Sequence, residues 1–364
     1  MVSSQVVSVS ISEETPKKYN VFISDISIFE DTKIIELFSK KRIMLIADEK
    51  AFGHHKDTLP EYLKKDAVYV VHDAEKSKNL GEIERITQWA LDHNFDRGAL
   101  VVSFGGGAVG DLAGFFASVY MRGVAFIQIP TTLLAQVDAS VGGKTAVNAC
   151  GAKNLIGSFY QPQAVIINSS FLQTLPTREL YSGMAEVIKM GVIGDEKLFS
   201  ISESVWGKDG FEPFVRINEI VELCVRLKMK IVADDERDLG NRMWLNLGHT
   251  TAHAIESVTN YSCYLHGEAV AFGCIVAAHF ALKLGICDEE TTKDIERTFA
   301  NVIQSCSFRD LSTNSIIEAM KYDKKRDGVG IRFIAPQQIG KVTILNNADV
   351  DLLHEVITEA IKRY

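Results

Sequence analysis

Two histidines one helical turn apart mark the segment of the chain with the most suggestive chemistry. Four polar residues recur here at steps of four, three and four: Arg242, Asn246, His249 and His253. This spacing predicts that they share one face of a helix. Apolar side chains such as Trp244 occupy the other faces, so an ordinary solvated face explains the stripe poorly. Histidines at i and i+4 can reach one metal ion, but the spacing leaves open which of them would bind it.

A glutamate and a third histidine supply further candidate metal ligands. Glu186 lies three residues before Lys189 in an apolar helical pattern, where buried charges need partners. His266 opens a long apolar run, so we expect it at a helix N-terminus, where the dipole disfavours imidazolium and leaves a ring nitrogen free for metal. One glutamate with two or three histidines suits zinc. Three protein ligands with an open position are typical of catalytic sites.

A glycine-rich turn indicates a phosphate-binding site. Gly105, Gly107 and Gly110 have G-x-G-x-x-G spacing between a predicted strand and a predicted helix, where backbone N–H groups can approach a pyrophosphate. The alternative is a tight turn without a ligand, because residues 129–132 lack the acidic residue expected about 20 positions later. Asp48, after another predicted strand, could hold a ribose hydroxyl instead or serve only as a turn residue.

Two halves with different periodicities must position these residues. Up to about residue 170, short β-branched runs alternate with helical patterns, which is typical of a parallel α/β sheet. The predicted strands cover residues 21–23, 43–47, 68–71, 100–104, 126–129 and 164–167. Later residues are mainly helical, apart from a predicted strand pair at 331–335 and 341–345. We therefore expect an α/β domain over 1–170 and a mainly α-helical domain over 171–364, with a cleft between them.

Composition limits the classes of partner. The chain has 39 Lys and Arg against 47 Asp and Glu, a net charge of −8, which argues against nucleic acid or an anionic membrane as the main partner. The six cysteines form no C-x-x-C pair and lie mostly in apolar runs, so we expect buried free thiols and a cytoplasmic protein. We expect no secretory signal, and we expect the apolar run after Glu268 to be a buried helix rather than a membrane span.

Further motifs add lysines on predicted glycine-rich loops. In chain order the motifs are GGGAVGDLAGF (105–115), IPTTLLAQVD (129–138), SVGGKT (140–145), KNLIG (153–157), GMAEVIK (183–189) and NLGHTTAHAIE (246–256). Together, from about residue 75 to 341, they closely resemble the sugar phosphate cyclases, and best the dehydroquinate-forming branch of that family. The first 40 residues carry none of this resemblance. One departure is ACGA at 149–152, where bacterial members often have His-Pro. Loop length is kept, but the loop precedes Lys153 and Asn154 and could tune which cyclase reaction is run.

The resemblance implies a homodimeric enzyme with a Rossmann-like N-terminal domain, a mainly α-helical C-terminal domain and an active site in the interdomain cleft. It also implies bound NAD and a divalent metal, usually zinc, with cobalt as an alternative. Carried over by motif, the metal ligands are Glu186, His249 and His266. His253 then becomes a catalytic residue on the substrate side, so the resemblance resolves what the spacing left open.

The remaining motif positions fall into three groups by their implied role. The other catalytic groups are Lys144, Lys189, Asn154, Arg242 and Asn246. The substrate-binding groups are Arg122, Asp138, Lys228 and Lys325. The dinucleotide-binding positions are Asp48, Glu75, Lys78, Gly106, Gly107, Asp111, Thr131, Thr132, Lys153, Thr174 and Glu179. We expect Lys144, Lys189 and Arg242 to be buried and to bind substrate anions rather than form surface ion pairs.

The implied reaction converts a phosphorylated sugar acid, 3-deoxy-arabino-heptulosonate 7-phosphate, into 3-dehydroquinate and phosphate. A hydride passes to NAD, phosphate leaves, the hydride returns, and an intramolecular aldol step closes the ring. One alternative is another sugar phosphate cyclase, of the aminodehydroquinate, inosose or valiolone type. A second is a metal- and NAD-dependent polyol dehydrogenase, which would need no cluster of cations. A third, a non-catalytic binding module, would retain costly buried charges without using them.

Overall fold

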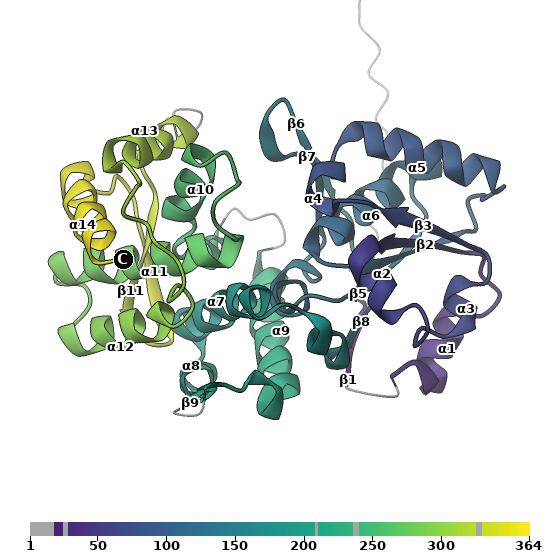
Figure 1. Cartoon of the computed structure of the whole chain (residues 1–364), viewed down its shortest axis with the longest axis horizontal. Helices are drawn as coiled ribbons and strands as arrows, with labels where there is room; N and C mark the ends of the chain where they lie inside the picture. The colour runs from purple at the N-terminus through teal and green to yellow at the C-terminus, as the bar shows by residue number, and fades with distance from the viewer. Residues whose placement is uncertain (1–17, 25–27, 208–209, 236–239, 325–329) are drawn as a thin grey trace, which may run out of the picture.

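A six-stranded parallel sheet organises the N-terminal half of the protein (Figure 1). The computed structural model describes residues 18–24, 28–207, 210–235, 240–324 and 330–364. The strands of this sheet are β1 (Asn20–Ser24), β2 (Ile43–Asp48), β3 (Ala67–Val71), β4 (Leu100–Gly105), β5 (Ala125–Pro130) and β8 (Ala164–Asn168). Their order is β1-β8-β5-β4-β2-β3, and every neighbouring pair is parallel. The six predicted strands and the α/β class are confirmed.

Both faces of the sheet are buried, which is why its strands read as continuous apolar runs. On β2, Met44 and Ile46 belong to one apolar core, whereas Ile43 and Leu45 belong to the core on the opposite face. Helices cover both faces. The first face carries α4 (Ala74–Ser77), α5 (Leu80–Asp92) and α6 (Gly107–Val119), and the second carries α1 (Thr32–Phe38), α2 (Glu49–His55) and α3 (Glu61–Lys64).

An antiparallel hairpin replaces the glycine-rich loops that we expected around the two lysine motifs. It consists of β6 (Lys144–Ala149) and β7 (Ala152–Phe159). The turn residues Cys150 and Gly151 have φ angles of 52° and 78°. Positive φ at both central positions is what a tight hairpin turn with the correct twist requires. The loop prediction is therefore wrong for the residues of β6 and β7, whereas residues 140–143 lie outside any helix or strand, as expected. Strand β6 packs on α6.

The C-terminal half is mainly helical, as predicted. Its helices are α7 (Thr177–Gly194), α8 (Glu196–Ser204), α9 (Ile217–Asp234), α10 (His249–Val258), α11 (His266–Lys283), α12 (Glu289–Ala300), α13 (Thr313–Lys324) and α14 (Val350–Arg363). The predicted strand pair is confirmed as antiparallel β11 (Phe333–Gln338) and β12 (Lys341–Leu345). A further pair, β9 (Trp206–Gly207) and β10 (Gly210–Phe211), was not predicted.

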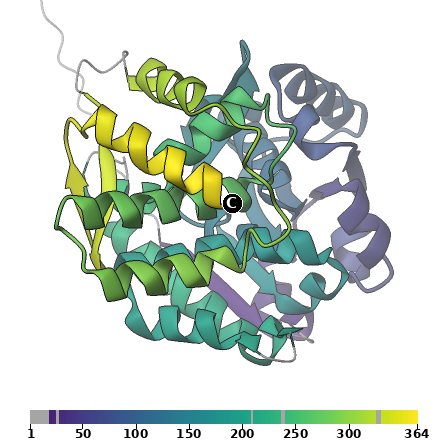
Figure 2. The same ribbon diagram turned by 60° about the vertical axis from the view of Figure 1, so that its left-hand side comes forward.

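The apolar helix α11 lies at the centre of this half and contacts α7, α10, α12 and α14 (Figure 2). The apolar core of this half extends to the sheet, because the cluster of buried side chains that contains α11 also contains Val165 and Ile167 of β8. No helix in the described residues is long and apolar enough to cross a membrane. All six cysteines are free thiols, but the expectation of burial fails for Cys150 and Cys263, which are exposed.

The polar stripe that we placed on one helix lies on two. A 3₁₀ helix, η6 (Asn241–Asn246), ends before Leu247, and α10 begins at His249. Between them Gly248 has a φ of 78°, which a side chain would disfavour. Arg242 and Asn246 therefore do not continue the face that carries His249 and His253. The prediction of one continuous helix is wrong, because a close approach by α11 requires a glycine at this point.

Candidate active site

The predicted dinucleotide-binding residues lie mostly along the carboxyl edge of the parallel sheet. Grouped by the strand that they end or follow, they are Asp48 (β2), Glu75 and Lys78 (β3), Gly106, Gly107 and Asp111 (β4), Thr131 and Thr132 (β5), and Thr174 and Glu179 (β8). The order of strands along the chain reverses between β2 and β4. Ligands of open α/β sheets bind in the crevice at such a reversal.

The turn after β4 brings backbones close together at this reversal. Gly106 precedes α6 and Gly107 is its first residue, so the unpaired N–H groups of the first helical turn lie at the sheet edge. A Cβ at Gly105 would lie 2.9 Å from the Cβ of Asp48, and one at Gly106 would lie 3.0 Å from Cγ2 of Thr132. Glycine is therefore required here for packing, and the same geometry can admit a phosphate.

Asp48 also caps a helix, as the alternative interpretation expected. Its Oδ1 accepts hydrogen bonds from the N–H groups of Lys50 and Ala51 at 3.0 and 2.9 Å. Both bonds go to the same oxygen, so capping of α2 uses one of the two carboxylate oxygens. The turn role of Asp48 thus leaves room for a second role.

A buried ion pair joins the dinucleotide edge to the hairpin. Lys78 Nζ lies 2.6 Å from Asp111 Oδ2 and also donates to Oδ1 of Asn154. Asn154 has a φ of 53°, and its N–H donates to Oδ1 of Asn148 at 3.0 Å. Burial raises the pKa of Asp111, and the Lys78 ammonium opposes that shift. Lys78 therefore joins Asn154, a predicted catalytic residue, to Asp111, a predicted dinucleotide-binding residue.

Two glycines on α11 bring the predicted metal ligands together. The N–H of Gly267 donates to Ser182 Oγ at 3.0 Å, and a Cβ at Gly267 would lie 1.9 Å from the carbonyl oxygen of Ser182. Ser182 precedes Glu186 by one turn of α7. A Cβ at Gly273 would lie 2.1 Å from the carbonyl oxygen of Gly248, next to the start of α10. Helix α11 thus packs directly on the backbones that carry the other two ligands.

Glu186, His249 and His266 form a cluster whose ligand atoms all lie within 4.8 Å of one another. Oε1 of Glu186 lies 3.7 Å from Nε2 of His249 and 3.5 Å from Nε2 of His266. Two ligands bound tetrahedrally at ~2.0–2.1 Å lie about 3.3 Å apart, so an ion such as zinc fits after small shifts. Oε1 of Glu186 is buried and makes no hydrogen bond. Such an orphaned oxygen fits a metal ligand.

His249 is prepared to act as a neutral ligand. Its Nδ1 lies 3.1 Å from the carbonyl oxygen of Leu247, so Nδ1–H can donate there while Nε2 faces Glu186. Burial, together with the Lys189 ammonium, holds the pKa of His249 well below its ordinary value. Nε2 therefore carries a lone pair at neutral pH.

His266 departs from the expectation that the helix dipole keeps it neutral. Burial lowers its pKa, but the nearby carboxylates of Glu186 and Glu256 outweigh burial and raise the pKa of His266 to about 9. Two nearby carboxylates carry more charge than the half-charge of a helix N-terminus, so the prediction is wrong for the metal-free protein. A metal ion at the cluster would displace this proton.

His253 lies beside the cluster, one turn along α10 from His249. Its ring centroid is 5.4 Å from that of His249 and 6.4 Å from that of His266, and its side chain is exposed. Among the described residues, the group able to hold an ion contains Glu186 and the two other histidines but not His253. The structure thus places His253 beside the cluster, outside the group of candidate ligands and with an exposed side chain.

Buried cations adjoin the cluster. Lys189 is 1% exposed and pairs with Oε2 of Glu186, while Lys228 pairs with Oδ1 of Asp138 at 2.8 Å. Burial alone would lower the pKa of Lys189, but Glu186 and Asp138 raise it, so Lys189 keeps its charge. Burial lowers the pKa of Lys228. Asp138 lies in a π-helical turn (Ala135–Ala139), which carries it between the two lysines.

The other predicted catalytic and substrate-binding groups are placed less uniformly. Arg242 is buried, as expected, and donates to the carbonyl oxygen of residue 142 at 3.1 Å. Lys144 is exposed at the start of β6, so the expectation that it is buried is wrong. Asn246 and Arg122 are also exposed. Lys325 lies outside the described residues.

Replacing Lys189 tests whether the buried cations bind the substrate. We expect Lys189→Met to raise KM by about 10-fold or more or to abolish turnover, because a charge-assisted contact contributes about 1.5–3 kcal/mol. The affinity of the Lys189→Met protein for NAD, measured by fluorescence titration, should change less than twofold. Lys230→Met on the exposed side of α9 is the control. An equal loss of substrate and NAD binding would instead indicate that Lys189 serves folding.

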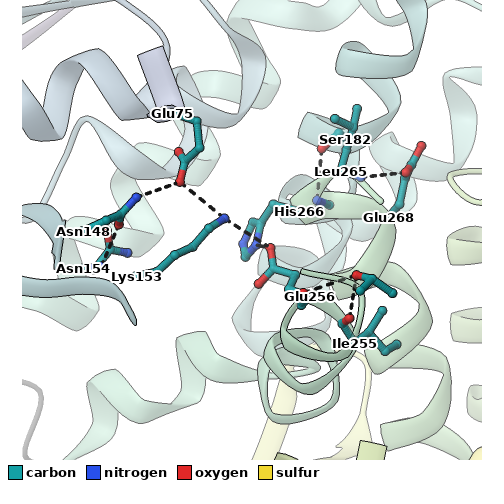
Figure 3. A network of polar contacts seen from close by, with 12 residues as sticks. Glu75, Asn148, Lys153, Asn154, Ser182, Ile255, Glu256, Leu265, His266 and Glu268 are labelled. Carbon is teal, nitrogen blue, oxygen red and sulfur yellow. Dashed lines mark hydrogen bonds and ion pairs between the residues drawn. The ribbon is translucent and has the colours of Figure 1, made fainter. Parts of the chain in front are cut away.

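One buried carboxylate received no role from the sequence. Glu256 lies 5% exposed on α10, with Oε1 at 3.1 Å from Nδ1 of His266 and at 4.0 Å from Nζ of Lys153 (Figure 3). The same lysine lies 3.5 Å from Oε1 of Glu75. Glu256 follows His249 by seven residues, two helical turns, and that spacing in an apolar helix was the available signal.

Two family models match adjoining parts of the chain. The 3-dehydroquinate synthase N-terminal model matches residues 68–182, and the 3-dehydroquinate synthase C-terminal model matches residues 183–326. A 3-dehydroquinate synthase from Desulforamulus reducens is 44% identical over 319 residues, which cover 86% of this chain and 89% of that protein. These matches include every motif that contributes to the cluster.

Solved structures of sugar phosphate cyclases share the fold. A 2-deoxy-scyllo-inosose synthase in complex with carbaglucose-6-phosphate, NAD⁺ and Co²⁺ has a TM-score of 0.81 and 26% identity, covering 93% of this chain and 96% of that one. A 2-epi-5-epi-valiolone synthase from Streptomyces hygroscopicus subsp. jinggangensis, with NAD⁺ and Zn²⁺ bound, has a TM-score of 0.83 and 21% identity, covering 98% and 100%. By its sequence matches and its fold, the chain belongs to the 3-dehydroquinate synthase family.

Proposed function

We propose that the protein converts 3-deoxy-arabino-heptulosonate 7-phosphate into 3-dehydroquinate and phosphate, a step of the shikimate pathway. The observation that carries this proposal is the cluster of Glu186, His249 and His266 beside buried cations, in a chain that matches both 3-dehydroquinate synthase models. The substrate carries a phosphate and a carboxylate, and buried cations can bind such anions in a protein whose net charge is negative.

NAD and a divalent metal, zinc or cobalt, are the cofactors of this activity. The cluster fits the metal, since Glu186 offers a buried oxygen without a hydrogen bond and His249 a neutral nitrogen. The turn at Gly106 and the first turn of α6 fit the pyrophosphate of NAD. When bound, NAD accepts and returns one hydride while the metal polarises the hydroxyl that is oxidised.

The placement of the side chains supports the roles that we propose for them. Lys189, Lys228 and Arg242 bind the anionic groups of the substrate, and Asp138 accepts hydrogen bonds from its hydroxyls. His253 lies beside the cluster with an exposed side chain, which supports a role in moving a proton to or from the substrate. These groups hold the flexible chain in one conformation, which favours ring closure.

The number of phosphates released per NAD tests the reaction. Because the hydride returns within each cycle, enzyme with metal, excess heptulosonate phosphate and sub-stoichiometric NAD should release many phosphates per NAD, with no lasting absorbance from NADH. Omission of NAD should stop phosphate release. Steady accumulation of NADH in proportion to product would contradict the proposal and favour the polyol dehydrogenase alternative.

We further propose two domains, 1–170 and 171–364, in a cytoplasmic homodimer. The domain boundary is supported by the end of β8, the last strand of the sheet, at Asn168. Free cysteines support a reducing compartment, which cell fractionation would check.

The homodimer is supported by exposed apolar side chains on the hairpin. Leu155 and Phe159 of β7 are 47% and 49% exposed, and a second copy could cover them. Sedimentation should give a dimer that Phe159→Asp weakens; a monomeric wild type would contradict this.

A further inference from the structure

We propose that Glu256 is a positioning residue for the metal ligand His266, and that Lys153 connects it to the dinucleotide side of the site. This inference rests on the proposed metal site but concerns residues outside the ligand set. It assigns a task to a buried carboxylate that lies outside the group able to hold a metal ion. It also makes the hairpin of β6 and β7 a contributor to metal binding.

The first step of the argument is the division of the two ring nitrogens of His266. Nδ1 lies 3.1 Å from Oε1 of Glu256, whereas Nε2 lies 3.5 Å from Oε1 of Glu186. If Nδ1–H donates to Glu256, the lone pair on Nε2 points to the cluster. A carboxylate behind a histidine ligand fixes its tautomer and ring orientation and increases its basicity. Glu256 occupies that place.

The second step is that His266 needs this support more than His249 does. His249 is oriented by the carbonyl oxygen of Leu247, two residues before it in the chain, and the side chain of His249 is 14% exposed. The side chain of His266 is 33% exposed and belongs to the first residue of α11, where packing restrains it less. We therefore infer that the hydrogen bond to Glu256 restrains the ring of His266.

The third step is the position of Lys153. Its Nζ lies 3.5 Å from Glu75 in the N-terminal half and 4.0 Å from Glu256 in the C-terminal half. It also lies 4.3 Å from the centroid of the Tyr261 ring. The contacts with Glu75 and Glu256 span the two halves of the protein (Figure 3). A cation between two carboxylates stabilises the charge of both.

The connection runs from Glu75 through Lys153 and Glu256 to His266. Glu75 and Lys153 are among the predicted dinucleotide-binding residues, and Glu75 also accepts a hydrogen bond from Asn148 of the hairpin at 3.2 Å. Removing the ammonium of Lys153 leaves Glu256 less restrained. We therefore expect that a change at Lys153 weakens metal binding although Lys153 is not a ligand.

Cobalt binding to the full-length metal-free protein tests the proposal. We expect Glu256→Ala to weaken Co²⁺ affinity about 10- to 100-fold, the usual effect of losing such a partner, and to change the visible absorption spectrum of bound Co²⁺. Glu256→Gln should have a smaller effect, because its amide oxygen still accepts from Nδ1–H. Lys153→Met should weaken affinity severalfold. Calorimetry measures the affinities, and thermal unfolding of the metal-free variants reports stability.

Glu82→Gln is the matched control, since Glu82 is also 5% exposed but bonds to Tyr69 in the sheet domain. It should leave Co²⁺ affinity and spectrum unchanged. The proposal is overturned if Glu256→Ala and Glu256→Gln both bind Co²⁺ within twofold of wild type with an unchanged spectrum. A wild type that binds Co²⁺ but releases no phosphate from the heptulosonate phosphate would contradict the proposed function and leave the role of Glu256 intact.

Discussion

His249→Ala should lose its metal and reduce turnover by at least about a thousandfold, whereas His253→Ala should keep its metal and lose turnover only. Loss of a metal forfeits several kcal/mol of transition-state stabilisation, and each 1.4 kcal/mol is tenfold in rate. Both histidines lie on α10, one turn apart, so the pair compares a ligand with its neighbour in one helix.

The expected difference rests on which ring faces the buried carboxylate. Nε2 of His249 lies 3.7 Å from Oε1 of Glu186, and its Nδ1 is occupied by a carbonyl. The side chain of His253 is exposed. Metal content by atomic absorption after dialysis separates the two variants, and circular dichroism checks that both are folded. If His253→Ala loses zinc as completely as His249→Ala, the assignment of the ligands is wrong.

The sheet could be predicted well from the sequence, because each of its strands shows the same apolar pattern within a few consecutive residues. Strands buried on both faces must be apolar throughout, and runs such as residues 43–47 and 100–104 carry that signal. The hairpin of β6 and β7 lacks this continuous apolar pattern. Leu155 and Phe159 are exposed there, and glycines and lysines dilute the strand pattern. Its existence depends on positive φ at Cys150 and Gly151, which composition does not report.

The site was predictable where residue type and spacing were sufficient. A buried glutamate and lysine on one helix, such as Glu186 and Lys189, need partners, and the structure supplies them with each other. The pKa values and the exposure of the charged side chains depend on tertiary contacts, which the sequence does not show. The pKa of His266 is raised by Glu186 and by Glu256, whose Oε1 lies 3.1 Å from Nδ1, and the sequence revealed neither contact. The prediction that Lys144 is buried was wrong for the same reason, because belonging to a motif does not determine how exposed a side chain is.

Gly267→Ala should destabilise the fold and weaken metal binding together. An added Cβ would lie 1.9 Å from the carbonyl oxygen of Ser182, a backbone atom that cannot turn aside as a side chain can. Helices α7 and α11 must then separate, and the lost packing should cost about 3 kcal/mol or more of the free energy of unfolding. Separation also moves His266, the preceding residue, away from Glu186, so Co²⁺ affinity should fall more than 10-fold.

Gly53→Ala provides the matched control for this prediction. Gly53 lies within helix α2, and a Cβ there would meet nothing within 4 Å. Alanine is the better helix former by about 1 kcal/mol, so this variant should be as stable as wild type or more stable, with unchanged Co²⁺ affinity. Urea unfolding and cobalt titration measure both quantities. A Gly267→Ala protein as stable as Gly53→Ala, with wild-type affinity for Co²⁺, would show that the contact between α7 and α11 does not position the ligands. The expected outcome is that one methyl group disturbs the metal site through the helix backbones alone, because Gly267 sets how closely the helix of His266 approaches the helix of Glu186.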